Sequence, residues 1–174
     1  MASTMPIIEL DGKKPRIDPS AFIAPNATII GDVEVGEGTS IWYGAVIRGD
    51  LAKIRIGKFN TIQDNSVIHG DGPTTIGDYC VLAHGCCVHG ATIRSHSLVS
   101  INAIVFDRAI IGEESIIALG AVVLADTKVP PRTVMGGVPA KPLRQATEND
   151  VALVKLGNKG YIDLSRRYKA QKLG

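Results

Sequence analysis

Aliphatic residues recur every six positions along most of this chain, and this period constrains the fold more than any other feature. An amphipathic helix would repeat its apolar residues at intervals of three and four, so the period is not helical. Each hexad is therefore interpreted as one short strand and one turn, with the aliphatic side chain pointing inward. The unbroken part of the series is Ile93, Val99, Val105, Ile111, Ile117, Val123 and Val129.

Three hexads make one triangular coil of about 18 residues, and stacked coils form parallel sheets spaced by roughly 4.8 Å. No hexad can bury its side chain alone, whereas stacking produces one continuous aliphatic column. An earlier series, interrupted near residue 50 and again after Ile68, extends the pattern over residues 17–139, with room for roughly seven coils. A β-sandwich with accidental spacing is a weak alternative, because the unbroken series alone has seven consecutive members.

The C-terminal segment departs from this period. Pro130 and Pro131 interrupt it, and Thr147 with Asp150 three positions later predicts the cap of a helix. We expect a solenoid domain over residues 1–142. Over residues 143–174 we expect a helix, broken by glycines at 157 and 160, that covers a flank or an end of the solenoid. Some cover is expected because an open end exposes unpaired strand edges.

Composition and charge exclude several classes of function. A net charge of +2 provides no basic footprint for nucleic acid. No apolar run approaches the roughly 20 residues that span a bilayer, and residues 1–6 lack the features of a secretory signal. Cys80, Cys86 and Cys87 resemble no disulfide framework and are expected to fill small apolar slots, with a thiolate ligand as the alternative. We therefore expect a cytoplasmic protein that binds neither nucleic acid nor membrane.

Three of the four histidines are related by the coil register. His69 follows the inward Ile68, and His89 follows the inward Val88, 20 positions later. The step after Ile68 contains two extra residues, so the corrected separation is 18, one full coil. The two imidazoles should therefore stack at one corner. His84 lies on another side of the triangle, so the spacing predicts a metal site between subunits, with two ligands from one chain and one from the next.

Further polar residues belong to the same region. Arg48 also follows an inward residue, and Asp50 places a carboxylate near it; a structural pair that locks an interface and a role in substrate binding both stay open. Gln63 is expected to point outward and to orient water beside Asp64, although turn hydrogen bonds would explain both residues. His96 lies outside this corner and is interpreted as an ordinary surface residue.

The ordered segments at residues 48–50, 62–69 and 84–90 resemble the γ-class carbonic anhydrases and their close relatives. With the Gly-Gly-Val-Pro-Ala-Lys exit at residues 136–141, the resemblance covers nearly the whole chain. It implies a left-handed parallel β-helix, an exception to the usual right-handed crossover, and a homotrimer. It also implies Zn²⁺, or alternatively Fe²⁺ or Co²⁺, at each interface, bound by His69, His84 and His89.

The resemblance implies further roles. Arg48 and Asp50 would form an intersubunit pair that can contact bicarbonate. Gln63 would position the metal-bound hydroxide, and Asp64 would belong to the same polar network. Tyr161 would be an active-site tyrosine contributed by the C-terminal helix.

Two departures from the family pattern weaken the expected activity. The best-characterised branch has a glutamate after the Arg-x-Asp and an acidic loop after the first histidine, both used to export protons. This chain has Leu51 at the first position, and its short loop contains only Asp71 as a substitute. A third difference is Thr61, where an asparagine is usual. We therefore expect hydration to be slow or absent.

The leading hypothesis is reversible hydration of carbon dioxide by metal-bound hydroxide. An acyltransferase that uses coenzyme A is the first alternative, because such solenoids share the Gly-x-Pro-Ala-Lys exit and use a single histidine as base. The second alternative is a metal-binding accessory protein, or a thioesterase-like hydrolase, with little hydration activity.

Overall fold

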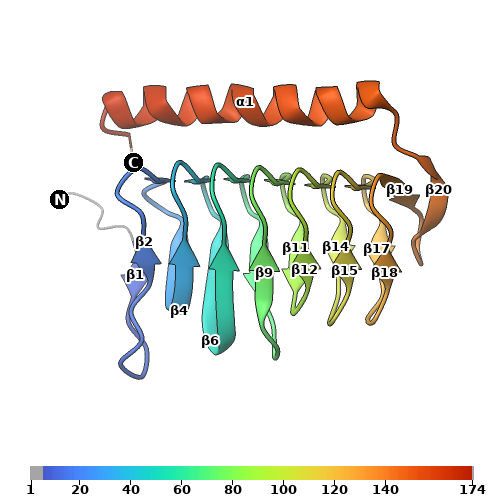
Figure 1. Ribbon diagram of the computed structural model, residues 1–174. Coiled ribbons are helices and arrows are strands. Elements are labelled where there is room, and N and C mark those ends of the chain that lie inside the picture. Colours follow the sequence, from blue (N-terminus) through green and yellow to red (C-terminus); the bar gives the residue numbers. More distant parts are fainter. Residues whose placement is uncertain (1–5, 174) are drawn as a thin grey trace.

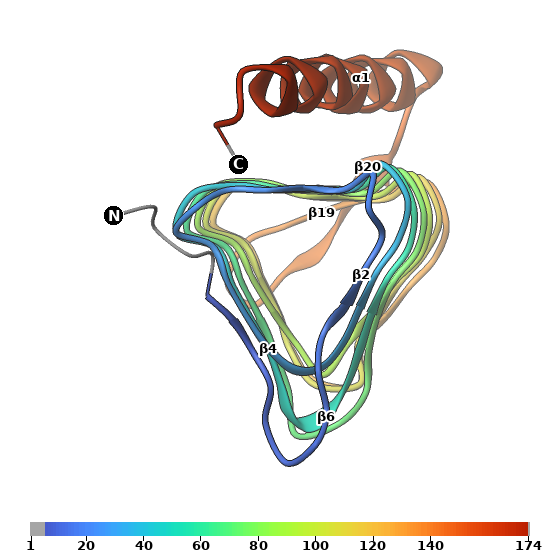
Figure 2. The same ribbon diagram turned by 90° about the vertical axis from the view of Figure 1, so that its left-hand side faces the viewer.

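The computed structural model describes residues 6–173 and shows a left-handed parallel β-helix with one helix along its flank (Figure 1). Viewed along the solenoid axis, the coils superimpose as a triangle (Figure 2). The predicted fold class is therefore confirmed. The expectation about a secretory signal concerned residues 1–6, of which 1–5 lie outside the described residues.

The first side of the triangle is a sheet that lies under the helix. Its strands stack one per coil and end with an antiparallel strand at the C-terminal end of the solenoid. They are β3 (Phe22–Ile23), β5 (Ser40–Ile41), β7 (Thr61–Ile62), β10 (Val81–Leu82), β13 (Leu98–Val99), β16 (Ile116–Ile117), β19 (Thr133–Gly136) and the antiparallel β20 (Lys141–Gln145).

The second and third sides are joined into one sheet, because two long strands, β4 (Thr28–Val35) and β6 (Val46–Ile56), run across the corner between them. The second side continues with β8 (Val67–His69), β11 (Cys87–His89), β14 (Ile104–Val105) and β17 (Val122–Val123), and β1 (Ile7–Ile8) pairs with β4. The third side consists of β2 (Arg16–Ile17), the distal parts of β4 and β6, β9 (Thr74–Ile76), β12 (Thr92–Ile93), β15 (Ile110–Ile111) and β18 (Lys128–Val129).

The core is the aliphatic column that the period predicted. Ile111 pairs in register with Ile93 on one side and with Val129 on the other, each one coil away. All three side chains are buried. The interruptions of the period lie at the corner between the second and third sides, where β6 extends across the corner and residues 70–73 form a loop. Insertions there leave the inward column unbroken.

The helix α1 (Glu148–Ala170) is continuous, so the predicted break is wrong. It begins at the predicted cap, where the Thr147 side chain accepts from the Asp150 amide and the Asp150 carboxylate accepts from the Thr147 amide. It then runs back along the first side toward the end that carries β1 and β2 (Figure 1). Gly157 and Gly160 are tolerated because packing against the sheet, rather than local propensity, supplies most of the stability of such a helix.

Among the described residues, no helix combines the length and the apolar character that crossing a membrane requires.

The aliphatic column makes a testable prediction about stability. Replacing the fully buried Ile111 with alanine should lower the free energy of unfolding by about 2–5 kcal/mol, because it leaves a cavity in a close-packed column. Ile110 precedes it on the same strand but points outward, so Ile110→Ala serves as the matched control and should cost clearly less. Urea unfolding of both variants measures the difference. Equal losses would contradict the inward assignment.

Candidate metal site

His69 and His89 stack on adjacent coils of the second side, as the corrected spacing predicted. They are paired residues of the neighbouring strands β8 and β11. Their ring centroids lie 5.3 Å apart, with the ring planes inclined by 66°. Both side chains are largely covered, with 13% of His69 and 21% of His89 exposed. Two imidazoles are therefore fixed side by side at the carboxyl ends of β8 and β11.

Each of these histidines is held by a carboxylate. The Nε2 atom of His69 lies 3.0 Å from Oδ1 of Asp50, and the Nδ1 atom of His89 lies 2.6 Å from Oδ1 of Asp107. An ionised carboxylate only accepts hydrogen bonds, so the ring nitrogen that faces it carries the hydrogen. The second nitrogen of each ring then has a free lone pair.

Asp50 also receives a hydrogen bond from the Arg48 guanidinium and one from the Leu51 amide at 3.0 Å. Burial opposes ionisation of Asp50, but the hydrogen bonds from Arg48, from the backbone and from His69 outweigh it, and the pKa of the carboxyl lies below its ordinary value. The Arg48–Asp50 pair thus forms within one chain and orients His69. Its contact with a second subunit stays a prediction.

His84 lies on the turn after β10, at the corner between the first and second sides, away from the other two histidines. Its Nδ1 atom is 2.9 Å from Oδ2 of Asp64, and its Nε2 atom is 3.2 Å from the hydroxyl of Tyr161. Its side chain is 43% exposed. Within residues 6–173 no three His, Cys, Asp or Glu side chains converge to hold a metal ion. One chain therefore presents a histidine pair and a separate single histidine.

The helix α1 brings Tyr161 to His84 through an aromatic contact and a polar contact. The ring of Tyr161 packs edge-on against Trp42, with centroids 5.4 Å apart. One turn away, the buried Asn158 accepts a hydrogen bond of 2.8 Å from the Thr61 hydroxyl. Thr61, which departs from the family pattern, thus helps to hold the helix on the sheet. Desolvation raises the pKa of Tyr161, so its hydroxyl stays protonated at neutral pH.

Gln63 and His96 differ from their expected environments. Gln63 leaves the coil outward, as predicted, but α1 covers it, and only 5% of it is exposed. His96 stacks on Tyr79 with ring centroids 5.2 Å apart and planes inclined by 7°. Its Nδ1 atom is buried and has no hydrogen-bond partner among the described residues, so His96 is not an ordinary surface residue. The burial of Gln63 follows from the position of α1, which the repeat does not determine. The stack of His96 follows from the coil register, in which Val81 pairs with Leu98 and Tyr79 aligns with His96.

Asp107 is a hydrogen-bond partner of a site histidine that the sequence reasoning missed. It lies in the turn after β14, 18 positions beyond His89. The one-coil step from His89 leads to Phe106, because Val88 pairs with Val105. Asp107 is the next residue, so the register places it near His89, but the contact itself depends on the direction of its side chain.

Two of the three cysteines occupy the small apolar slots that were expected. Cys80 and Cys86 are buried in the core. Burial raises the pKa of both thiols to about 12, and it also raises the pKa of the half-buried Cys87 thiol. A thiolate is therefore disfavoured at all three positions at neutral pH.

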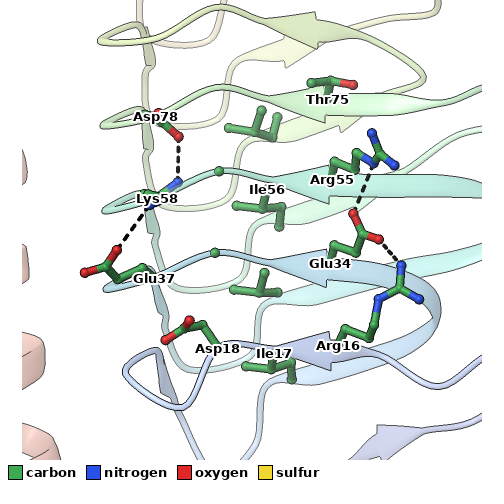
Figure 3. A pocket seen from close by; sticks show the side chains of 14 residues that line it. Arg16, Ile17, Asp18, Glu34, Glu37, Arg55, Ile56, Lys58, Thr75 and Asp78 are labelled. Atoms are coloured by element: carbon green, nitrogen blue, oxygen red, sulfur yellow. Dashed lines mark hydrogen bonds and ion pairs between the residues drawn. The ribbon is translucent and has the colours of Figure 1, made fainter.

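A groove of about 660 Å³ lies on the third side near the N-terminal end and contains none of the predicted site residues (Figure 3). Its three cationic side chains are paired with carboxylates. Glu34 pairs with Arg16 and, at 3.0 Å, with Arg55, while Lys58 lies 3.3 Å from Glu37. A groove whose cations are already paired offers no strong attraction to an anionic ligand.

Comparison with known proteins identifies relatives of this chain. A family model described as bacterial transferase hexapeptide (six repeats) matches residues 14–49. A carbonic anhydrase of Geobacillus kaustophilus is 42% identical over 161 residues, which cover 91% of this chain and 88% of that protein. Two mitochondrial γ carbonic anhydrases of Arabidopsis thaliana are 35% identical over 91% of this chain, which spans only 60% and 61% of their length.

Solved structures include both a close and a distant relative. A hexapeptide transferase family protein from Anaplasma phagocytophilum has a TM-score of 0.92 and 40% identity, covering 94% of this chain and 98% of that one. A variant of a perosamine N-acetyltransferase from Caulobacter crescentus, solved with coenzyme A and GDP-perosamine, has a TM-score of 0.58 and 26% identity, covering 75% of this chain and 57% of that one. The coverage and identity of the curated relatives show that the chain belongs to the γ-class carbonic anhydrase-like family of hexapeptide-repeat proteins.

Proposed function

We propose that this protein is a metal-dependent carbonic anhydrase that hydrates carbon dioxide reversibly at a site shared between subunits of a homotrimer. The observation that carries the proposal is the stacked pair His69 and His89, each with one ring nitrogen bound to a carboxylate. The relatives named carbonic anhydrase support carbon dioxide and bicarbonate as the substrates.

The donor set fits a divalent metal ion. His69, His84 and His89 each face a carboxylate with one ring nitrogen, which is the usual arrangement of histidines that bind a metal through the other nitrogen. Three imidazoles with one open position are typical of catalytic zinc sites, and imidazole also suits iron and cobalt. When bound, the metal would lower the pKa of a coordinated water to near neutrality and so supply the nucleophile.

Exposed apolar residues around the histidines support a neighbouring subunit on this face. Phe106 stacks on His89, with ring centroids 5.1 Å apart, although 44% of it is exposed. Along the corner above His84, Ile101 and Leu119 are 41% and 71% exposed. A threefold ring would bury both surfaces, because each subunit would place its His84 corner on the His69–His89 face of the next.

The remaining polar residues would hold the substrate and the ligands. Asp50, Asp64 and Asp107 fix the orientation of the three imidazoles. The Arg48 guanidinium is 42% exposed and provides a positive charge for bicarbonate. At the His84 corner, which the next subunit would supply to this face, the protonated Tyr161 hydroxyl can donate a hydrogen bond, and Gln63 lies beside Tyr161 under α1.

Proton export is the step of the reaction for which this chain provides few side chains. Leu51 is 65% exposed where a proton-carrying glutamate would be expected, and no hydrogen bond or ion pair of the exposed Asp71 side chain is found in the described part of the chain. We therefore expect turnover to be limited by proton transfer to buffer.

The alternative of an acyltransferase is supported by the fold shared with an enzyme solved with coenzyme A. An acyltransferase would need one histidine as base, whereas here three histidines are each oriented by a carboxylate. Retention of the protein on immobilised coenzyme A, together with metal-independent acetyl transfer, would favour this alternative.

The first functional prediction concerns the ligands. Protein purified without oxygen should contain about one metal ion per chain and should hydrate carbon dioxide in a stopped-flow assay, faster as buffer concentration rises. His69→Ala should lose both the metal and the hydration, because two of three ligands cannot retain the ion. His96→Ala, which removes a histidine outside the site, is the control. Unchanged metal content in His69→Ala would overturn the proposal.

The second functional prediction concerns Asp107. Asp107→Asn should weaken metal binding by roughly 10–100-fold, because the carboxylate that orients His89 is lost. Asp126→Asn is the matched control, since Asp126 lies one coil further along and pairs only with the exposed Arg108. Competition with a fluorescent chelator measures the affinities. Equal affinities of the two variants would show that Asp107 does not position His89.

A further inference from the structure

An apolar pocket of about 230 Å³ lies between α1 and the first side of the solenoid. Strands β10 and β13 form its floor, and residues 153–161 of the helix, about two turns, form its roof. No charged side chain lines it. Its apolar lining consists of Val81, Leu98, Leu153, Val154 and Gly157.

Gly157 lines the helix side of the pocket and is exposed. A Cβ atom built on Gly157 would meet no heavy atom within 4 Å. Glycine weakens the interior of a helix relative to alanine. Because a Cβ atom would touch nothing here, packing does not require glycine at this position. Gly157 therefore leaves space that any larger side chain would begin to fill.

The pocket adjoins the candidate metal site. Tyr161 and Gln63 line one part of it, and the Tyr161 hydroxyl lies 3.2 Å from Nε2 of His84. A group that occupies the pocket would consequently pack against the tyrosine that contacts a site histidine.

The size and lining of the pocket define its ligand. An anion such as bicarbonate would lose its hydration there without gaining a charged partner. A cavity of about 150 Å³ lined by aliphatic and aromatic side chains can hold benzene, and a water molecule occupies roughly 30 Å³ in the liquid. This pocket is therefore larger than a triatomic substrate needs, and it fits an uncharged group of several carbon atoms.

We propose that the pocket beneath Gly157 binds a short, uncharged aliphatic chain beside Tyr161. The chain is either the apolar part of a second substrate of the site or a free effector molecule. The binding itself requires neither metal nor turnover. Only the choice between the two sources rests on the proposed function.

The test uses 1-butanol as the probe and the full-length protein with labelled methyl groups. Titration should shift the methyl resonances of Leu98, Leu153 and Val154 in a saturable manner. Gly157→Leu should abolish saturation or weaken binding about tenfold, as expected when two methylene groups are excluded from an apolar site. Gly157→Ala, a smaller change that suits the helix, should weaken binding less.

Gly160→Leu is the matched control, because Gly160 lies on the same helix, is exposed, and would also meet no heavy atom within 4 Å of its Cβ. It should bind the probe as the parent protein does. Absence of saturable shifts in the parent protein, or equal binding by Gly157→Leu and the parent, would overturn the proposal.

A second measurement separates the two sources of the chain. If the chain belongs to a substrate, p-nitrophenyl butyrate should be hydrolysed by the metal-loaded protein and not by Gly157→Leu. In that reaction the oxygen of water bonds to the carbonyl carbon, the bond to p-nitrophenolate breaks, and the proton of water is released. If the chain is an effector, the ester is left intact and 1-butanol changes hydration in the parent and in Gly160→Leu, but not in Gly157→Leu.

Discussion

The rest of the structure depends on the vertical register of the inward aliphatic side chains. Each coil buries its aliphatic residues only against the coils above and below, so the coils must stack in phase. Phase also arranges every outward residue in a column. His69, His89 and Phe106 form one such column, and His84, Ile101 and Leu119 form another. The hydrophobic core thus positions polar residues that it never contacts.

The helix α1 contributes what the repeat cannot. It covers the first side of the solenoid and places the Tyr161 hydroxyl beside His84. Its position is fixed by the Trp42 ring and by the hydrogen bond from Thr61 to Asn158. The pocket lined by Gly157 lies in the same contact region between helix and sheet. The contacts that hold the helix and the contact of Tyr161 with His84 therefore lie together between the helix and the sheet.

The fold and the histidine pair could be predicted from sequence because both follow from a period that is visible in the residues themselves. The stacking of His69 on His89 required only the count of inserted residues. The burial of Gln63 and the continuity of the helix could not be predicted, because they depend on how α1 packs on the sheet. The stack of His96 on Tyr79 was predictable in principle, since Val81 pairs with Leu98 and Tyr79 therefore aligns with His96. Asp107 follows Phe106, the residue one coil beyond His89, and its contact with His89 depends on the direction of its side chain. The trimer and the metal stay predictions, because they involve a second chain and an ion.

The central claim is that the metal site is divided between chains, and subunit mixing tests it most directly. Neither His84→Ala nor His69→Ala should bind metal alone. In mixed oligomers, the intact His69–His89 face of the first variant meets the intact His84 corner of the second. Co-refolding the two variants should therefore restore metal binding and hydration at these mixed interfaces. Mixed oligomers that form but stay as metal-free and inactive as each variant alone would contradict a shared site.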